Sequence, residues 1–276
     1  MTDGTWLTVR VSPGSHRDAV MAALFDAGAQ GVQELGDQLI THVPDRAVAD
    51  ALTAAAVAAS SDASVAIEPL PDVDWSVQWK QSIRAQTLGA LTVGPPWLTE
   101  RLDATTTITI DPGMAFGTGE HATTRGVIRL LQSVIWAGDH VADLGAGSAV
   151  LAIAAAKLGA ASVAAIELDP DAIGNAEENV RRNGVGDRVT VIEGDAASLL
   201  PLVAPVRVIT ANIISSVLLE LLPVLAASLA DDGRVILSGI LFTERDEMVR
   251  AVTAAGWRVE AEDQEDAWWS TTIARR

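Results

Sequence analysis

Val141-Ala-Asp-Leu-Gly-Ala-Gly-Ser-Ala149 is the stretch that decides the fold. An apolar strand pattern over His140–Leu144 leads into two glycines, and the helical pattern Val150–Leu158 follows. Glycine lets a backbone bend sharply or approach a ligand closely, because it has no Cβ. A strand, a glycine-rich turn and a helix in this order indicate the crevice beyond the strand ends where open α/β sheets bind ligands.

Strands and helices alternate on both sides of this turn. Strands are predicted at His140–Leu144, Ser162–Glu167, Arg188–Glu193, Val206–Ala211 and Gly233–Ser238, and helices at Thr124–Ile135, Val150–Leu158, Asp171–Asn183, Ser216–Leu229 and Glu244–Ala255. A final hairpin spans Trp257 to Arg276. Repeated β-α units with continuous apolar strands predict an α/β fold, a doubly wound parallel sheet that is buried on both faces.

The first seventy residues predict a separate small α+β domain. Strands are expected at Trp6–Val11, Gly31–Leu35, Gln38–Val43 and Ser64–Pro69, and helices at Ser15–Ala27 and Arg46–Ala59. The order β-α-β-β-α-β is the ferredoxin-like arrangement, with two helices on one face of an antiparallel sheet. Residues 71–110 are predicted to be a linker, with a short helix at Asp74–Lys80 and lead-in strands, and residues 111–276 to be the large domain.

The composition narrows the chemistry. The chain of 276 residues has no cysteine, which excludes disulfides, cysteine nucleophiles and thiolate metal sites. Its four histidines show no ligand spacing, so no metal site is expected. The net charge of −17 favours cationic partners and disfavours nucleic acid, although the acidity is equally explained by solubility. With no apolar run long enough to span a membrane and no signal-like start, we expect a cytoplasmic protein and no membrane partner.

The turn itself favours one kind of cofactor. A Gly-x-Gly turn also serves dinucleotides, but the third glycine expected for them is Ala149 here, and the acidic Asp143 precedes the turn. Negative charge would disfavour a diphosphate and favour the ammonium and sulfonium of S-adenosylmethionine. Glu167, at the end of the next strand, is suited to accept hydrogen bonds from both ribose hydroxyls. The alternative for Glu167 is a charge placed at a helix N-terminus.

A second glycine-rich stretch precedes this turn. It reads Asp111-Pro-Gly-Met-Ala-Phe-Gly-Thr-Gly-Glu-His-Ala-Thr-Thr124. It is not a phosphate loop, because Gly119 is followed by Glu120 and His121 rather than by lysine and a hydroxyl residue.

These two stretches, with Thr210-Ala-Asn-Ile213 and the terminal Asp266-Ala-Trp-Trp269, resemble the bacterial PrmA-type ribosomal-protein methyltransferase family. The resemblance covers nearly the whole chain. It implies a Rossmann-like class I S-adenosylmethionine-dependent methyltransferase domain and a small N-terminal domain that recognises the substrate. The substrate it implies is large-subunit ribosomal protein eleven, a basic protein methylated on lysine side chains and on an α-amino group.

The resemblance also implies which residues contact S-adenosylmethionine: Thr124, Gly145, Glu167 and Asn212, each at a matching motif position. Gly147 belongs to the same turn and completes the predicted cofactor set. No metal ligand is implied. We expect the protein to act as a monomer, without direct nucleic-acid binding.

Asn212 is the predicted catalytic residue. It ends the fourth strand of the large domain, where its amide oxygen would accept a hydrogen bond from the incoming amine. The alternative is that Asn212 only caps the helix that follows. His121 is either a general base or a loop hydrogen-bonder, Phe116 either covers the cofactor or anchors its loop, and Asp195 either receives the adenine amino group or closes a turn.

Three other functions remain open from the sequence. The chain could methylate another protein lysine or a small amine, or be a catalytically silent cofactor-binding module. A nicotinamide oxidoreductase is a further alternative, which predicts NAD binding and no affinity for S-adenosylmethionine.

Overall fold

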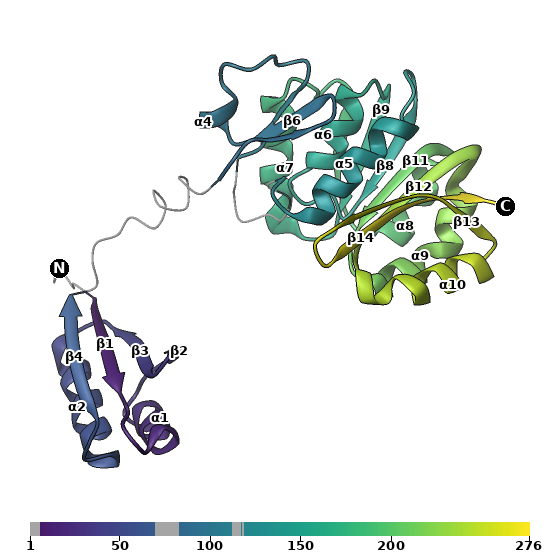
Figure 1. Cartoon of the computed structure of the whole chain (residues 1–276). Helices are drawn as coiled ribbons and strands as arrows, with labels where there is room; N and C mark the ends of the chain where they lie inside the picture. The colour runs from purple at the N-terminus through teal and green to yellow at the C-terminus, as the bar shows by residue number, and fades with distance from the viewer. Residues whose placement is uncertain (1–5, 70–82, 112–116, 118) are drawn as a thin grey trace. The chain divides into compact units, whose positions relative to one another are not determined.

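The computed structural model describes residues 6–69, 83–111, 117 and 119–276, which divide into two compact units (Figure 1). One unit is Met1–Gln81 and the other is Ser82–Arg276. The lead-in strands before residue 110 therefore belong to the larger unit rather than to a separate linker. The predicted helix at Asp74–Lys80 and the position of Phe116 lie outside the described residues.

The smaller unit is a four-stranded antiparallel sheet with two helices packed on it. Its elements are β1 (Leu7–Ser12), α1 (Arg17–Asp26), β2 (Gln33–Leu35), β3 (Gln38–Val43), α2 (Arg46–Ala59) and β4 (Ser64–Pro69). The strand order is β2-β3-β1-β4, with β1 paired to both β3 and β4. Val9 and Val11 alternate along β1 and are fully buried in one core with Val20 and Leu24 of α1 and Leu52 of α2. This is the ferredoxin-like domain predicted from the sequence.

The larger unit is built around a seven-stranded sheet of order β10-β9-β8-β11-β12-β14-β13. Its strands are β8 (His140–Leu144), β9 (Ser162–Glu167), β10 (Val189–Glu193), β11 (Val206–Asn212), β12 (Leu229–Leu241), β13 (Trp257–Glu265) and β14 (Trp268–Arg275). The first five strands in this order are parallel, and β14 pairs with β12 in the antiparallel direction. The final hairpin thus joins the sheet and makes it mixed, whereas the sequence predicted a parallel sheet followed by a separate hairpin.

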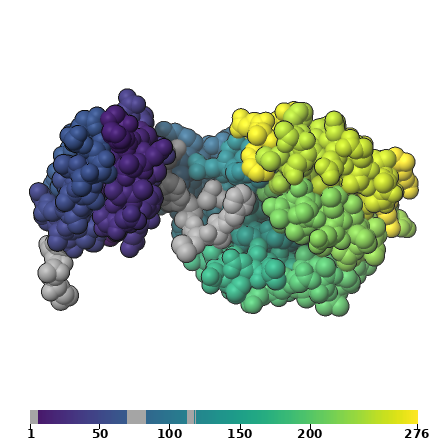
Figure 2. All heavy atoms as spheres, turned by 90° about the horizontal axis from the view of Figure 1, so that it is seen from below, coloured from purple at the N-terminus to yellow at the C-terminus, as the bar shows by residue number. Residues whose placement is uncertain are grey.

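Helices cover both faces of this sheet, as predicted. They are α5 (Ala122–Val134), α6 (Val150–Lys157) and α7 (Pro170–Arg182) on one face, and α8 (Ala196–Val203), α9 (Ser215–Ser228) and α10 (Arg245–Ala254) on the other. The helix α8 was not predicted from the sequence, because α8 is short and contains Pro201, which interrupts a helical pattern. In the space-filling view the C-terminal strands, in yellow, pack directly against the yellow-green segment before them (Figure 2). The structure therefore has the predicted Rossmann-like α/β architecture.

A smaller sheet leads into the large one. It comprises β5 (Gln86–Leu88), β6 (Leu91–Gly94) and β7 (Thr107–Thr109), with α4 (Pro96–Thr99) between β6 and β7. Asn183, at the end of α7, binds both backbone groups of Thr109: its Oδ1 accepts from the nitrogen at 2.8 Å and its Nδ2 donates to the oxygen at 2.7 Å. These bonds dock β7 on α7. Among the described residues, no helix is both long and apolar enough to cross a membrane.

Candidate cofactor and methyl-transfer site

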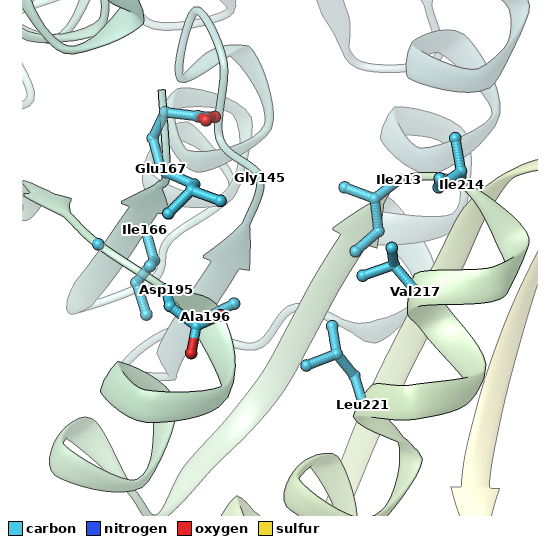
Figure 3. A pocket seen from close by; sticks show the side chains of 11 residues that line it. Gly145, Ile166, Glu167, Asp195, Ala196, Ile213, Ile214, Val217 and Leu221 are labelled. Carbon is cyan, nitrogen blue, oxygen red and sulfur yellow. The ribbon is translucent and has the colours of Figure 1, made fainter. Parts of the chain in front are cut away.

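A cavity of about 390 Å³ opens at the carboxyl ends of β8, β9, β10 and β11. This is the edge where β8 and β11 are spatial neighbours although the chain leaves them for opposite faces of the sheet. Two walls face each other across the cavity (Figure 3). Gly145, Ile166, Glu167, Asp195 and Ala196 lie on one side, and Ile213, Ile214, Val217 and Leu221 lie on the other. Leu168 and Gly194 also line the cavity.

The glycine turn and Glu167 come together as one unit of this site. The Glu167 carboxylate accepts a hydrogen bond from the Gly147 nitrogen at 2.7 Å and another from the Asp169 nitrogen at 2.9 Å. The Gly145 and Ala146 nitrogens both donate to the Ile166 carbonyl. A carboxylate has about four lone-pair sites, so Glu167 retains acceptor capacity toward the cavity. The structure thus brings Gly145, Gly147 and Glu167 together as the sequence predicted, while their binding roles stay predictions.

The turn is bent through left-handed backbone conformations. Gly145 and Gly147 have φ of +69° and +52°, and Ala149 has φ of +64°. An L-residue in this region carries roughly 1–2 kcal/mol of strain, which glycine avoids. A Cβ added to Gly145 would lie 2.6 Å from Cγ2 of Ile213, so the two walls lie close together at this glycine.

Replacing Gly145 with alanine is expected to lower the affinity for S-adenosylmethionine about tenfold or more. The added Cβ would displace Ile213 from the cavity wall and strain the turn, and a loss of about 1.4 kcal/mol corresponds to a factor of ten. Gly184→Ala is the matched control, because Gly184 has a similar φ of +64° and open space at its Cβ. Isothermal calorimetry with S-adenosylhomocysteine measures both. Equal losses of affinity in the two variants would contradict the role of Gly145.

Asp143 does not lie at the cavity wall, contrary to the expectation that it would face the positive charges of the cofactor. Its side chain is 1% exposed and accepts hydrogen bonds from the Thr210 hydroxyl at 2.6 Å and from the Ala152 nitrogen at 3.1 Å. Burial raises the pKa of this carboxyl to about 6, and the charge of Glu167 adds to the effect. Asp143 instead links β8 to β11 beneath the turn, because a buried carboxylate must satisfy its oxygens internally.

Asn212 is the last residue of β11, and its neighbours Ile213 and Ile214 line the cavity. The alternative that it caps the next helix is wrong, since α9 has Ile214 at its N-cap and no side-chain capping bond. Within the part of the chain that the structure describes, the Asn212 carboxamide makes no hydrogen bond. Its donor and acceptor are therefore available for a ligand.

Thr124 and His121 lie at the start of α5. The Thr124 side chain is 1% exposed, does not line the cavity, and its hydroxyl is buried without a hydrogen-bond partner among the described residues. His121 is the N-cap: its Nδ1 accepts from the Thr123 nitrogen at 3.4 Å, and its ring meets that of Trp268 edge-on at 4.9 Å. Burial, together with the positive charge of Arg125, lowers the pKa of His121. Capping is the observed role of this histidine, as the loop hydrogen-bonding alternative predicts.

Asp195 has the structural role that the sequence left open, and its contact with the adenine amino group stays a prediction. It caps α8 by accepting from the Ser198 nitrogen at 2.9 Å and from the Ser198 hydroxyl at 2.7 Å, and these bonds lower its pKa. It also lines the cavity, so its backbone can contact a ligand even though its carboxylate is engaged.

The sequence did not predict that apolar residues form much of the two cavity walls. Leu168 directly follows β9, Ala196 is the first residue of α8, and Val217 and Leu221 lie one helical turn apart on α9. Their positions shortly after strand ends, or on the helix that follows β11, were the available signal. No cluster of three or more metal-ligating side chains occurs among the residues that the structure describes.

A family model described as Ribosomal protein L11 methyltransferase (PrmA) matches residues 43–276, which include every described residue of this site. The chain belongs to this family.

Individual relatives agree with the PrmA family assignment. A ribosomal protein L11 methyltransferase of Exiguobacterium sp. is 41% identical over 216 residues, 77% of this chain and 68% of the relative. One of Heliobacterium modesticaldum is 42% identical over 209 residues, 75% of this chain and 65% of the relative. The chain thus spans about two thirds of the length of these curated relatives.

A solved structure shares the fold. The crystal structure of a ribosomal protein L11 methylase from Lactobacillus delbrueckii subsp. bulgaricus superposes with a TM-score of 0.62 at 31% identity. The match covers 70% of this chain and 99% of the other.

Proposed function

We propose that this chain is an S-adenosylmethionine-dependent protein methyltransferase that modifies lysine side-chain and N-terminal amines of a large-subunit ribosomal protein, the L11 named in its relatives. One observation carries the proposal: in a chain of the PrmA family, a cavity lies between the glycine turn closed by Glu167 and Ile213, the residue that directly follows Asn212 at the end of β11. We further propose that it acts as a monomer in the cytoplasm, without binding nucleic acid or membranes.

The residues of the site fit this cofactor. The Glu167 carboxylate suits two ribose hydroxyls, and the apolar side chains of both walls suit the flat faces of adenine. Gly145 lines the cavity and has no Cβ, so its backbone can lie close to the ligand. The buried Thr124 hydroxyl has no hydrogen-bond partner among the residues that the structure describes, so it is a polar group for which a bound ligand, reached after a small shift, would supply the missing bond.

When bound, S-adenosylmethionine supplies an electrophilic methyl group on a sulfonium sulfur. The substrate ammonium would first lose one proton to solvent, and the lone pair of the neutral nitrogen would then form the new C–N bond as the C–S bond breaks, leaving a methylated ammonium and a neutral thioether. A lysine with a solution pKa of about 10.4 must be neutral before it can attack. A desolvated site next to positive charge favours that neutral form.

Asn212 is the group proposed to orient the amine. Its carboxamide oxygen would accept a hydrogen bond from the attacking N–H, and orientation of this kind can contribute several kcal/mol to catalysis. Because the carboxamide is uncharged, it does not retain the methylated ammonium as an ion pair. This property suits repeated methylation of one nitrogen.

The proposed reaction is tested with labelled S-adenosylmethionine and total ribosomal proteins, followed by mass spectrometry to locate the label. Label on the lysines and N-terminus of ribosomal protein L11 is the expected result. Label on another protein or on a small amine would show that the substrate is not ribosomal protein L11. Cofactor binding without any label would favour a catalytically silent cofactor-binding module. Binding of NAD in place of S-adenosylmethionine would overturn the proposal entirely.

Removing residues 1–81 is expected to leave S-adenosylmethionine binding within about threefold and to abolish methylation of the ribosomal protein. The larger unit holds the whole cavity, while residues 1–81 carry eleven acidic residues against three arginines and one lysine and would attract a basic protein. Calorimetry and the labelling assay measure the two properties on the same truncated protein. Full methylation by the truncated protein would show that the smaller unit does not recognise the substrate.

A further inference from the structure

A buried hydrogen bond joins the two glycine-rich stretches of the larger unit. The Ser148 hydroxyl, in the turn after β8, donates to the carbonyl oxygen of Gly117 at 2.7 Å. Ser148 is 1% exposed and Gly117 is also buried, so water does not compete for this bond. The turn at the cavity is therefore tied directly to the segment that leads into His121 and Thr124 of α5.

Asn179 of α7 holds the same two stretches from the other side. Its side chain is fully buried, its Nδ2 donates to the Ser148 carbonyl at 3.2 Å, and its Oδ1 accepts from the Asp111 nitrogen at 3.0 Å. Asp111 begins the first glycine-rich stretch, and Arg182 of the same helix binds its carboxylate at 3.0 Å. One side chain thus connects the start of that stretch to the turn.

Gly117 packs closely against Ser148 and Val150 at this hydrogen bond. Its φ is +106°, and a Cβ there would lie 2.7 Å from the Ser148 Oγ and 3.3 Å from Cγ1 of Val150. The carbonyl reaches the Ser148 hydroxyl only because the backbone lies directly against the turn. A buried carbonyl that loses its donor is costly, so the bond resists being broken.

We propose that Ser148 and Asn179 are positioning residues for methyl transfer: they fix Gly117 and Asp111, in the first glycine-rich stretch, relative to the turn that holds the cofactor. The inference rests on the proposed function. Neither side chain lines the cavity, so both act through the backbone that they hold. A displacement of about 1 Å at a reacting centre can lower a rate by as much as a hundredfold.

The test compares Ser148→Ala with the unaltered full-length chain in steady-state methyl transfer. The backbone of the turn keeps its bond from Asn179, so we expect kcat to fall tenfold or more while KM for S-adenosylmethionine changes less than threefold. Asn179→Asp keeps an acceptor for Asp111 and loses the donor to Ser148. We expect it to lower kcat as well, and the double variant to be less impaired than the product of the two single effects.

Asn183→Ala is the matched control, because Asn183 lies one helical turn beyond Asn179 and holds β7 without touching Ser148 or Gly117. It should lower Tm and leave kcat unchanged. Unaltered kcat in Ser148→Ala would overturn the inference, as would a parallel loss of Tm, cofactor binding and kcat in all three single variants. No transfer by the unaltered chain would instead overturn the proposed function, and this inference with it.

Discussion

Replacing Asn212 with alanine is expected to lower kcat for methylation of the ribosomal protein by about 10²- to 10³-fold. Removal of one pre-positioned polar group that binds at a reacting centre has effects of this size in other enzymes. The Asn212 carboxamide ends β11 beside the cavity and is not used by the fold, so its truncation leaves no buried partner unsatisfied. Affinity for S-adenosylmethionine should fall much less than kcat. Single-turnover kinetics with calorimetry on the same protein separates the two quantities.

Asn212→Asp is the companion variant. It has the same shape but carries a charge that would hold the methylated ammonium as an ion pair. We expect it to accumulate monomethylated product where the unaltered protein adds further methyl groups, which mass spectrometry of the product resolves. Near-normal turnover by Asn212→Ala would remove this residue from the mechanism.

Replacing Glu167 with alanine is expected to weaken binding of S-adenosylmethionine by about 100-fold or more. Hydrogen bonds to a charged group contribute roughly 1.5–3 kcal/mol each, and the substitution removes two proposed bonds to the ribose as well as the bond that closes the turn at Gly147. Glu167→Gln keeps acceptors at the same place and should weaken binding only about tenfold. Calorimetric titration with S-adenosylhomocysteine measures both variants.

Glu193→Ala is the matched control for this experiment. Glu193 pairs with Glu167 in register at the end of the neighbouring strand β10, and it does not line the cavity. Its loss should leave the affinity unchanged. If Glu193→Ala weakened binding as much as Glu167→Ala, the effect would arise from the general charge of this edge rather than from a ribose contact.

Local sequence patterns predicted most of the fold. Continuous apolar strands such as Ser162–Glu167 are stable only between two layers of helices. The sequence pattern therefore predicted these strands and their order along the chain. The glycines at 145 and 147 marked the ligand edge because few other residues adopt their conformation. The helix α8 was missed because Pro201 and its short length hide the pattern, and the antiparallel pairing of β14 with β12 depends on tertiary contacts.

The sequence predicted which residues lie at the strand ends that form the site. It did not predict the direction in which each of their side chains points, and the role of a residue depends on that direction. Gly145, Glu167 and Asn212 all lie at the expected edge. Asp143 also lies near the end of its strand, β8, yet its side chain is buried below the turn, where it accepts a hydrogen bond from Thr210. The bonds of Ser148 and Asn179 join segments far apart in the chain, and nothing local to either residue indicates them.

The strand order has a consequence for how the protein assembles. One wall of the cavity follows β8, β9 and β10, and the other follows β11, so the cavity exists only after the two halves of the sheet have paired between β8 and β11. The part of the sheet from β8 to β10 supplies only one wall of the nucleoside site, and the part that begins at β11 supplies only the other. The cofactor therefore binds only the completed sheet, and its binding energy adds to the free energy of unfolding of that sheet as a whole. Supply of cofactor in the cell would thereby act on the lifetime of the folded enzyme as well as on its turnover.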